Sequence, residues 1–191
     1  MEARDDDLAR RIRRGDRNAF DAFFDGYSGP LLGYLAGMVS DRALAEDLLQ
    51  ETMLRVYRRI DRYQERGAFR SWVFRIATNL ALTELRRRRL AATEALDERV
   101  LELPSPGVSD PGELFETGER ERLVEAGLAI LADEQRSVIL LRVRHGMEVQ
   151  EIAHTLCVPE GTVKSRIHHA VRKLREFVEQ RDGRTIRGAR K

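Results

Sequence analysis

The chain has 191 residues, of which 35% are charged and only 6% aromatic, with five prolines and one cysteine. This length can bury a core in one or two domains, and the low aromatic content favours an all-helical protein over a sheet protein. A single cysteine excludes an internal disulfide framework and a cysteine-rich zinc site. No apolar run is long enough to cross a bilayer and the N-terminus is too acidic for a signal peptide, so we expect a cytoplasmic protein without a membrane segment.

The formal net charge of +2 conceals three blocks of alternating sign. Residues 52–92 hold eleven arginines against three acids, residues 93–125 hold ten acids against three arginines, and residues 161–191 hold ten basic residues against three acids. Two basic blocks around an acidic one are typical of polyanion-binding modules joined by a connector that nucleic acid repels. For any single block, a solvated helix face is the alternative.

Three apolar stripes with helical spacing occupy the first half of the chain. They consist of Phe20, Phe23, Phe24, Tyr27, Leu31 and Leu35; of Ala45, Leu48, Leu49, Thr52, Met53, Val56 and Ile60; and of Phe69, Trp72, Val73, Ile76, Ala77 and Leu80. Each stripe is typical of the core-facing side of an amphipathic helix. Gly29-Pro30 is expected to interrupt the first helix, Ser40-Asp41 precedes the second, and Arg66-Gly67 precedes the third. These features predict a helical bundle over residues 8–90.

A change of composition divides the rest of the chain. Residues 91–118 include LPSPGVSDPGE, which holds three of the five prolines, and they predict a flexible acidic linker. Helical patterns resume over residues 119–178, and residues 179–191 predict a basic disordered tail because they lack apolar content. The predicted fold is therefore all-α, with two small helical domains joined by the linker.

The segment EVQEIAHTLCVPEGTVKSRIHHAVRKLR predicts two short helices joined by a tight turn. Gly146 ends the preceding helix, Glu151 occupies the position of a capping-box acid, and Cys157 fits a buried apolar position at the turn. In the second helix Val163, Ile167, Ala170, Val171, Leu174 and Phe177 are expected to face the core. The outer face then carries Thr162, Lys164, Ser165, Arg166, His168, His169 and Arg172. This is the plan of a helix-turn-helix that reads the DNA major groove; a plain helical hairpin is the alternative.

The upstream basic block has a different character, because aromatic and basic residues are interleaved. Tyr63, Phe69 and Trp72 could stack on unpaired bases, and Arg75, Asn79, Leu82 and Arg86 fall on the exposed side of the same helix. Such a surface suits single-stranded DNA, whose bases need a stacking platform and whose backbone needs cations. The alternative places Phe69 and Trp72 in the core. The helix before it has a polar face of Glu46, Asp47, Gln50, Glu51, Arg55 and Arg58, which suits a protein partner or solvent equally.

Three segments in this order resemble the group IV, or extracytoplasmic function, bacterial sigma factors: AEDLLQETMLRVYRRI, AFRSWVFRIATNLALTELRRRR and LADEQRSVILLRVRHGMEVQEIAHTLCVPEGTVKSRIHHAVRKLRE. The resemblance implies a promoter-recognition subunit of RNA polymerase that needs no cofactor or metal. It implies contacts of Asp47, Leu48, Gln50, Glu51 and Arg55 with the clamp of the polymerase β′ subunit, and a contact of the C-terminal domain with the β flap. It assigns the minus-ten element to Tyr63, Phe69, Trp72, Arg75, Asn79 and Arg86, and the duplex minus-thirty-five element to Thr162, Lys164, Ser165, Arg166, His169 and Arg172. An anti-sigma factor is an expected further partner.

Two positions depart from the family pattern. His169 stands where such proteins often have arginine, and Glu148 replaces the usual small hydroxyl cap. Two other classes of protein compete with this interpretation. A stand-alone LuxR-like helix-turn-helix regulator would bind duplex DNA and ignore polymerase. An enzyme acting on nucleic acid is disfavoured, because the sequence has no clustered carboxylates for metals, no phosphate-binding glycine loop and no nucleophile–base pair.

Overall fold

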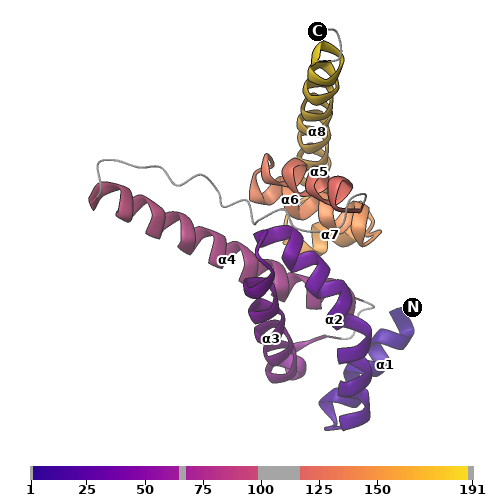
Figure 1. Ribbon diagram of the computed structural model, residues 1–191. Coiled ribbons are helices and arrows are strands. Elements are labelled where there is room, and N and C mark those ends of the chain that lie inside the picture. The colour runs from indigo at the N-terminus through magenta and orange to yellow at the C-terminus, as the bar shows by residue number, and fades with distance from the viewer. Residues whose placement is uncertain (1, 65–67, 99–116, 189–191) are drawn as a thin grey trace.

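The computed structural model describes residues 2–64, 68–98 and 117–188. Every regular element in these ranges is a helix, which confirms the all-α prediction. The N-terminal half contains α1 (Glu2–Arg13), α2 (Arg17–Val39), α3 (Arg42–Arg59), the 3₁₀ turn η1 (Ile60–Arg62) and α4 (Phe69–Glu98) (Figure 1). The C-terminal half contains α5 (Thr117–Ala129), α6 (Asp133–Ile139), the π-helical turn η2 (Leu140–Arg144), α7 (Val149–Leu156) and α8 (Glu160–Gly188).

Aspartate caps start two of the N-terminal helices. The Asp16 side chain accepts a hydrogen bond from the Ala19 amide at 3.2 Å, at the start of α2. Asp41 accepts one from the Leu44 amide at 3.1 Å, at the start of α3, and Ser40 before it is left-handed with φ 53°. Both caps satisfy amides that have no partner inside the helix. The predicted helix boundary at Ser40-Asp41 is confirmed.

The predicted interruption at Gly29-Pro30 is wrong, because α2 runs without a break through Pro30. Proline removes one backbone hydrogen bond and crowds the preceding turn, at a cost of roughly 3 kcal/mol. Apolar side chains on both sides of it, including Phe23, Leu31 and Leu35, are fully buried on one face. Burial of about 2 kcal/mol for each such side chain outweighs the local cost, so tertiary packing holds the helix together.

The expected linker and tail are both shorter than the sequence indicates. Helix α4 continues to Glu98 and α5 begins at Thr117, so helix occupies both ends of the expected linker; its remaining part, residues 99–116, lies outside the described residues. The prediction of a disordered tail from residue 179 is wrong as far as Gly188, because α8 continues to that residue. A helix that is already nucleated extends through Glu179, Gln180 and Arg181 at little cost, because these residue types favour the helix.

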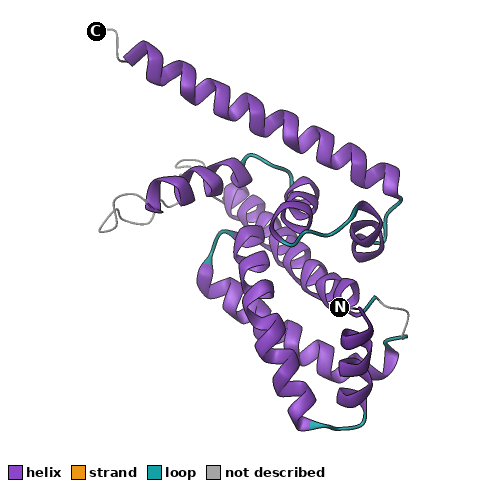
Figure 2. Ribbon diagram, turned by 90° about the vertical axis from the view of Figure 1, so that its right-hand side faces the viewer, coloured by secondary structure: helices purple, strands orange, loops and turns teal. Residues whose placement is uncertain are grey.

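The two halves lie against each other, and the ends of α4 and α8 project away from them (Figures 1 and 2). Helix α2 contacts α6 and η2, and α4 contacts α7. Buried residues from both halves, such as Met38 and Leu140, belong to one connected core. Among the helices that the structure describes, none combines the length and the apolarity that a membrane-spanning segment requires.

Candidate nucleic-acid interface

Helices α7 and α8 and the turn between them form the predicted helix-turn-helix. Cys157 ends α7 in the left-handed region, with φ 54°, and its amide donates to the Ala153 carbonyl. Its thiol is exposed, so the prediction of a buried Cys157 is wrong: the left-handed backbone that turns the chain also directs the side chain outward. At the start of α7 the Glu148 amide donates to the Glu151 carboxylate at 2.6 Å, which confirms the role expected of Glu151.

The outer face of α8 carries the six side chains predicted to read the minus-thirty-five element. Lys164, Ser165, His169 and Arg172 are exposed, and Thr162 and Arg166 are partly buried. The ion pairs of this face are long, 3.8 Å for Lys164 with Glu160 and 3.9 Å for Arg172 with Glu176. Pairs of this kind contribute little and leave the cations available to phosphate.

The buried face of α8 includes fewer residues than the sequence predicts. Val163 and Ala170 are completely buried. Val171, expected in the core, is 43% exposed. One further residue along α8 turns the side chain by about 100°, so Val171 lies beside the apolar stripe that Ala170 belongs to.

The aromatic residues assigned to the minus-ten element form a packed cluster. Phe69 is fully buried and Tyr63 is 5% exposed, whereas Trp72 is half-buried. The Trp72 ring lies 5.9 Å from Phe69 in a stacked arrangement and 5.4 Å from Tyr63, between ring centroids. Trp72 is therefore the member of this set with a face near solvent, and the two other rings support it from inside.

Arg75 and Asn79 lie one turn apart on α4, downstream of this cluster. Asn79 is exposed. The Arg75 guanidinium donates to the backbone carbonyl of His154 at the end of α7, and it lies 3.3 Å from the His154 ring Nδ1. Burial, and after it the charge of Arg75, lowers the pKa of His154. Arg75, which is predicted to bind the minus-ten element, is thus hydrogen-bonded to the helix-turn-helix half of the same chain.

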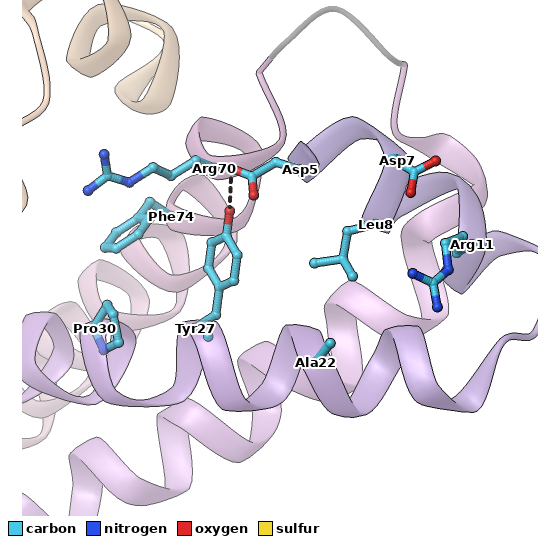
Figure 3. Close-up of a pocket in the computed structure, with 10 residues that line it drawn as sticks. Asp5, Asp7, Leu8, Arg11, Ala22, Tyr27, Pro30, Arg70 and Phe74 are labelled. Atoms are coloured by element: carbon cyan, nitrogen blue, oxygen red, sulfur yellow. Dashed lines mark hydrogen bonds between the residues drawn. The ribbon is translucent and has the colours of Figure 1, made fainter. Parts of the chain in front are cut away.

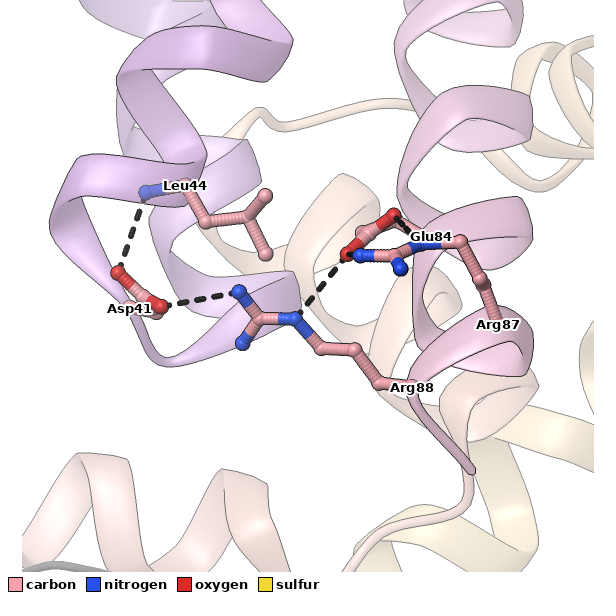
Figure 4. Close-up of polar contacts among 5 residues, drawn as sticks. All are labelled: Asp41, Leu44, Glu84, Arg87 and Arg88. Carbon is pink, nitrogen blue, oxygen red and sulfur yellow. Dashed lines mark hydrogen bonds and ion pairs between the residues drawn. The ribbon is translucent and has the colours of Figure 1, made fainter. Parts of the chain in front are cut away.

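Most of the arginine run at the end of this basic block is engaged within the protein (Figure 4). Arg87 donates to both oxygens of Glu84, at 2.7 and 2.8 Å, and Arg88 bridges Glu84 and Asp41, with 3.1 Å to each. The hydrogen bond from Arg87, and that from Arg88, lower the pKa of Glu84 to about 2. Arg89 pairs with Asp133 of α6. Arg86 is exposed and has no ion pair with any residue that the structure describes.

Helix α3 presents the predicted polymerase-binding face. Asp47 and Gln50 are exposed, and Arg55 donates to the Glu51 carboxylate at 2.6 Å. Leu48, assigned to the same face, is only 8% exposed and belongs to the core. Its position on the buried stripe of α3 explains this placement.

Sequence reasoning missed two apolar residues beside this face. Leu54 is 47% exposed and Tyr57 is 56% exposed. Together with Phe20 and the α1–α2 turn at Gly15 they line a cavity of about 330 Å³. The Phe20 and Tyr57 rings meet edge to face at 5.3 Å. The signal was present as an i, i+3 apolar pair lying off the core stripe of α3.

A larger cavity, of about 480 Å³, lies between α1, α2 and α4 (Figure 3). Two of its polar groups are already engaged: the Tyr27 hydroxyl donates to Asp5 at 3.1 Å, and the Arg70 guanidinium lies 5.8 Å from the centre of the Phe74 ring. Burial, with the charge of Asp5 after it, raises the pKa of Tyr27. In the described residues no three His, Cys, Asp or Glu side chains gather as a metal site would require.

Comparison with known proteins matches both halves separately. The family model described as Sigma-70 region 2 matches residues 23–91, and the model described as Sigma-70, region 4 matches residues 127–176. The ECF RNA polymerase sigma factor SigW of Bacillus subtilis is 30% identical over 87% of this chain and 92% of its own length. SigE of Mycolicibacterium smegmatis is 37% identical over 76% of this chain, which spans only 56% of that relative. The solved sigma factor RpoE of Bartonella quintana, in complex with the anti-sigma factor NepR, has a TM-score of 0.66 at 22% identity and covers 84% of this chain and 96% of its own.

Proposed function

The chain belongs to the extracytoplasmic function RNA polymerase sigma factors, and we propose that its helix α3 binds the polymerase and its helices α4 and α8 bind the promoter. As a member of this family it binds core RNA polymerase and directs initiation at specific promoters. A stand-alone LuxR-like regulator would have no use for a region 2 half, so that alternative is set aside. We assign no enzymatic activity to the chain, and we place its action in the cytoplasm, where its polymerase partner works.

The polymerase-binding face that we propose is the outer side of α3. Asp47 and Gln50 supply exposed polar and acidic groups toward the β′ clamp, and the partly buried Glu51 is held in place by its 2.6 Å ion pair with Arg55. Leu54 and Tyr57 add exposed apolar area at the edge of the same face. Aromatic side chains are enriched in protein interfaces, so this exposed apolar area supports a partner for the face. Leu48 supports the face from the core. The C-terminal half would contact the β flap.

For the minus-ten element we propose the side of α4 that carries Trp72, Arg75, Asn79 and Arg86. The half-buried Trp72 offers a ring to an unstacked base, and the Asn79 amide can read a base edge. Arg86 is exposed and unpaired within the described residues, so it can hold a phosphate. Tyr63 and Phe69 position Trp72 from inside the bundle and do not themselves reach solvent.

For the duplex minus-thirty-five element we propose the outer face of α8. Thr162, Ser165 and Arg166 lie in its first two turns, at the end of a recognition helix that meets base edges. Lys164 and Arg172 extend the same exposed face and would contact phosphate, and we assign His169 on this face to a base edge. His169 can donate or accept a hydrogen bond, so its base preference differs from that of an arginine. The anti-sigma partner of the structurally similar RpoE supports a partner of that class for this chain too.

The observation that carries this proposal is the coexistence in one chain of an exposed helix-turn-helix face and a separate region 2 half with its own basic face. Its test is transcription from a genomic promoter library with purified core polymerase. We expect transcripts that share a bipartite promoter. Asp47→Lys combined with Glu51→Lys should abolish retention on core polymerase, whereas Asp25→Lys on the exposed side of α2 should not. Specific transcripts from the double variant would contradict the assignment of α3.

Asn79→Ala tests the minus-ten surface separately. The variant should assemble with core polymerase and bind promoter duplex, but permanganate reactivity of the melted thymines should fall about tenfold, because one base-edge contact of 1–3 kcal/mol is lost. Ala92→Ser, at an exposed position of α4 that does not share the face of Asn79, is the matched control. Full melting by Asn79→Ala, with the control also intact, would remove Asn79 from the site.

A further inference from the structure

Helix α1 binds both ends of Tyr63, the residue that follows η1. The Tyr63 hydroxyl donates to the Asp6 carboxylate, and the Tyr63 carbonyl accepts from the Arg13 guanidinium at 2.6 Å. The same guanidinium lies 3.4 Å from the Ile60 carbonyl at the start of η1. Hydrogen bonds with one ionised partner are about twice as strong as neutral ones. Tyr63 is therefore held by residues that lie 50 and 57 positions away in the chain.

The helical period brings Asp6 and Arg13 to the same side of α1. They are seven residues apart, and seven steps of about 100° complete almost two turns. Between them, Ala9 and Ile12 are buried in the core, so α1 is anchored to the bundle. Helix α1 can therefore act as a fixed support for the two ends of Tyr63.

A second tyrosine is bound to α1 in the same manner. The Tyr27 hydroxyl of α2 donates to the Asp5 carboxylate at 3.1 Å (Figure 3). The Tyr27 ring packs against Phe69 at 5.9 Å, between ring centroids. Among the ring contacts that the structure describes, those of Trp72 are with Tyr63 and Phe69. Both tyrosines thus share one kind of bond to α1, but only Tyr63 connects α1 to Trp72.

Tyr63 stands between α1 and the half-buried ring of Trp72. The Tyr63 centroid lies 5.4 Å from that of Trp72 and 5.2 Å from that of Phe69. Tyr63 itself is only 5% exposed, so its ring supports Trp72 from inside. A side chain that is already fixed loses little conformational freedom when a ligand binds, and this strengthens binding. The bonds from α1 therefore affect how well Trp72 can receive a base.

From these contacts we propose that Asp6 and Arg13 are positioning residues for capture of the minus-ten element. They hold Tyr63, and Tyr63 holds the indole of Trp72 in place for an unstacked base. Neither of them needs to touch the DNA. Helix α1, which carries none of the residues assigned to DNA, thereby contributes to the affinity for the open strand. This inference rests on the proposed contact of Trp72 with a base of the minus-ten element.

The first test measures the environment of the Trp72 ring in the full chain. Trp72 is the single tryptophan of the sequence, so its fluorescence reports one ring. Tyr63→Phe keeps the ring and removes the hydroxyl, and Asp6→Ala removes the acceptor. We expect acrylamide to quench the indole more strongly in both variants than in the wild type. Tyr27→Phe is the matched control, because it also removes a hydroxyl bound to an α1 carboxylate, and its quenching should equal that of the wild type. Unchanged quenching in both variants would show that α1 does not position the ring.

Binding of promoter DNA by the holoenzyme supplies the second measurement. The probe is a promoter fragment taken from the wild-type transcripts and mismatched over the minus-ten element, so that its strands are already apart. Tyr63→Phe and Asp6→Ala should bind it about tenfold more weakly, near the lower limit for losing a hydrogen bond to a charged group. Retention on core polymerase should not change. Asp6→Asn keeps an acceptor for the Tyr63 hydroxyl and should recover most of the affinity.

The bond to the Tyr63 carbonyl has its own pair of variants. Arg13→Met should also weaken binding of the mismatched probe. Arg11→Met should not, because the exposed Arg11 pairs with Asp16 at 2.9 Å. Equal weakening by the two variants would indicate the charge of α1 and contradict a positioning role for Arg13.

The combination of variants separates positioning from general stability. The double variant Asp6→Ala, Tyr63→Phe should bind the mismatched probe no more weakly than either single variant, because both remove the same bond. Additive losses, or an equal loss of retention on core polymerase, would overturn the proposal. If Trp72→Ala weakens binding but Asp6→Ala and Tyr63→Phe do not, the proposed role of Trp72 stands and the positioning role fails. If Trp72→Ala binds like the wild type, the proposed role of Trp72 fails and the positioning role fails with it.

Discussion

Arg136 is the side chain whose removal should affect the structure most. It is only 9% exposed, and its guanidinium donates to three backbone carbonyls: Leu128 at 2.9 Å, Met38 at 2.6 Å and Leu131 at 3.4 Å. Two of these carbonyls lie at or near the end of α5 and one near the end of α2. Arg136 therefore closes the carbonyl ends of two helices from different halves of the chain.

Arg136→Met removes these bonds while keeping most of the side-chain volume. Hydrogen bonds to a charged group contribute about 1.5–3 kcal/mol each, but the buried charge also loses its desolvation penalty when it is replaced. We take about 3 kcal/mol as the net loss in the free energy of unfolding. For a chain of this size that corresponds to a fall in Tm of about 6–12 °C. Arg136→Lys should retain less than half of the free energy of unfolding that Arg136→Met loses, since one ammonium group cannot reach three carbonyls.

Urea unfolding followed by circular dichroism measures this loss. Arg142→Met is the matched control: Arg142 also donates to a carbonyl, that of Met147 at 2.9 Å, but its side chain is 40% exposed and it should lose under about 1 kcal/mol. A loss below about 1 kcal/mol for Arg136→Met, or full rescue by Arg136→Lys, would refute the reasoning.

Three further predictions concern single groups. The His145 ring should titrate near pH 4 by NMR in the folded chain and closer to 6.5 in urea. Neutral His145 stabilises the folded chain above pH 6.5, and this stability is lost as the pH falls toward 4, so a midpoint near 6.5 in the folded chain would contradict the burial of the ring. Tyr34→Phe should lower the free energy of unfolding in urea by about 1 kcal/mol, and Thr78→Val should lower it more. The Thr78 hydroxyl accepts a hydrogen bond from Tyr34 at 2.8 Å and donates one to the Phe74 carbonyl at 2.7 Å. A larger loss for Tyr34→Phe than for Thr78→Val would exclude this chain of bonds. The Leu44 amide, and then Arg88, hold the pKa of Asp41 below 3.8, so the Tm advantage over Asp41→Asn should be present at pH 7 and shrink by pH 3; an advantage equal at both pH values would show that the charge is not involved.

The sequence predicts best where a feature depends on neighbouring residues. The Ser40-Asp41 boundary is predictable from a local turn signal, and in the structure Asp41 caps α3 by accepting from the Leu44 amide at 3.1 Å. The same holds for Glu151 and the start of α7. The apolar stripes of α2 to α4 were visible because the helical period repeats over several turns.

The features that sequence reasoning missed depend on residues far apart in the chain. Pro30 stays within a helix because apolar side chains on both sides of it are buried in the core. The stabilisation from this burial depends on distant residues, so the local sequence does not indicate it. Phe69 and Trp72 look alike in sequence, yet one is buried and the other half-buried, because Phe23 and Tyr27 of α2 pack against the first. The contact of Arg75 with His154 joins residues 79 positions apart, and neither residue type indicates the other.

Counting charges along the sequence overstates what a basic block offers to DNA. The run of four arginines at residues 86–89 suggests a strongly cationic end to α4. In the folded chain Arg87 and Arg88 share Glu84, and Arg89 lies against Asp133 of the other half. A phosphate must displace those carboxylates before it can bind these three side chains, so only Arg86 is free of that competition among the described residues. Helical geometry places Glu84 within reach of two arginines at i+3 and i+4, and Asp133 engages the third, so the net charge of the block does not reveal that Arg86 alone of the four lacks an ion pair with a described residue.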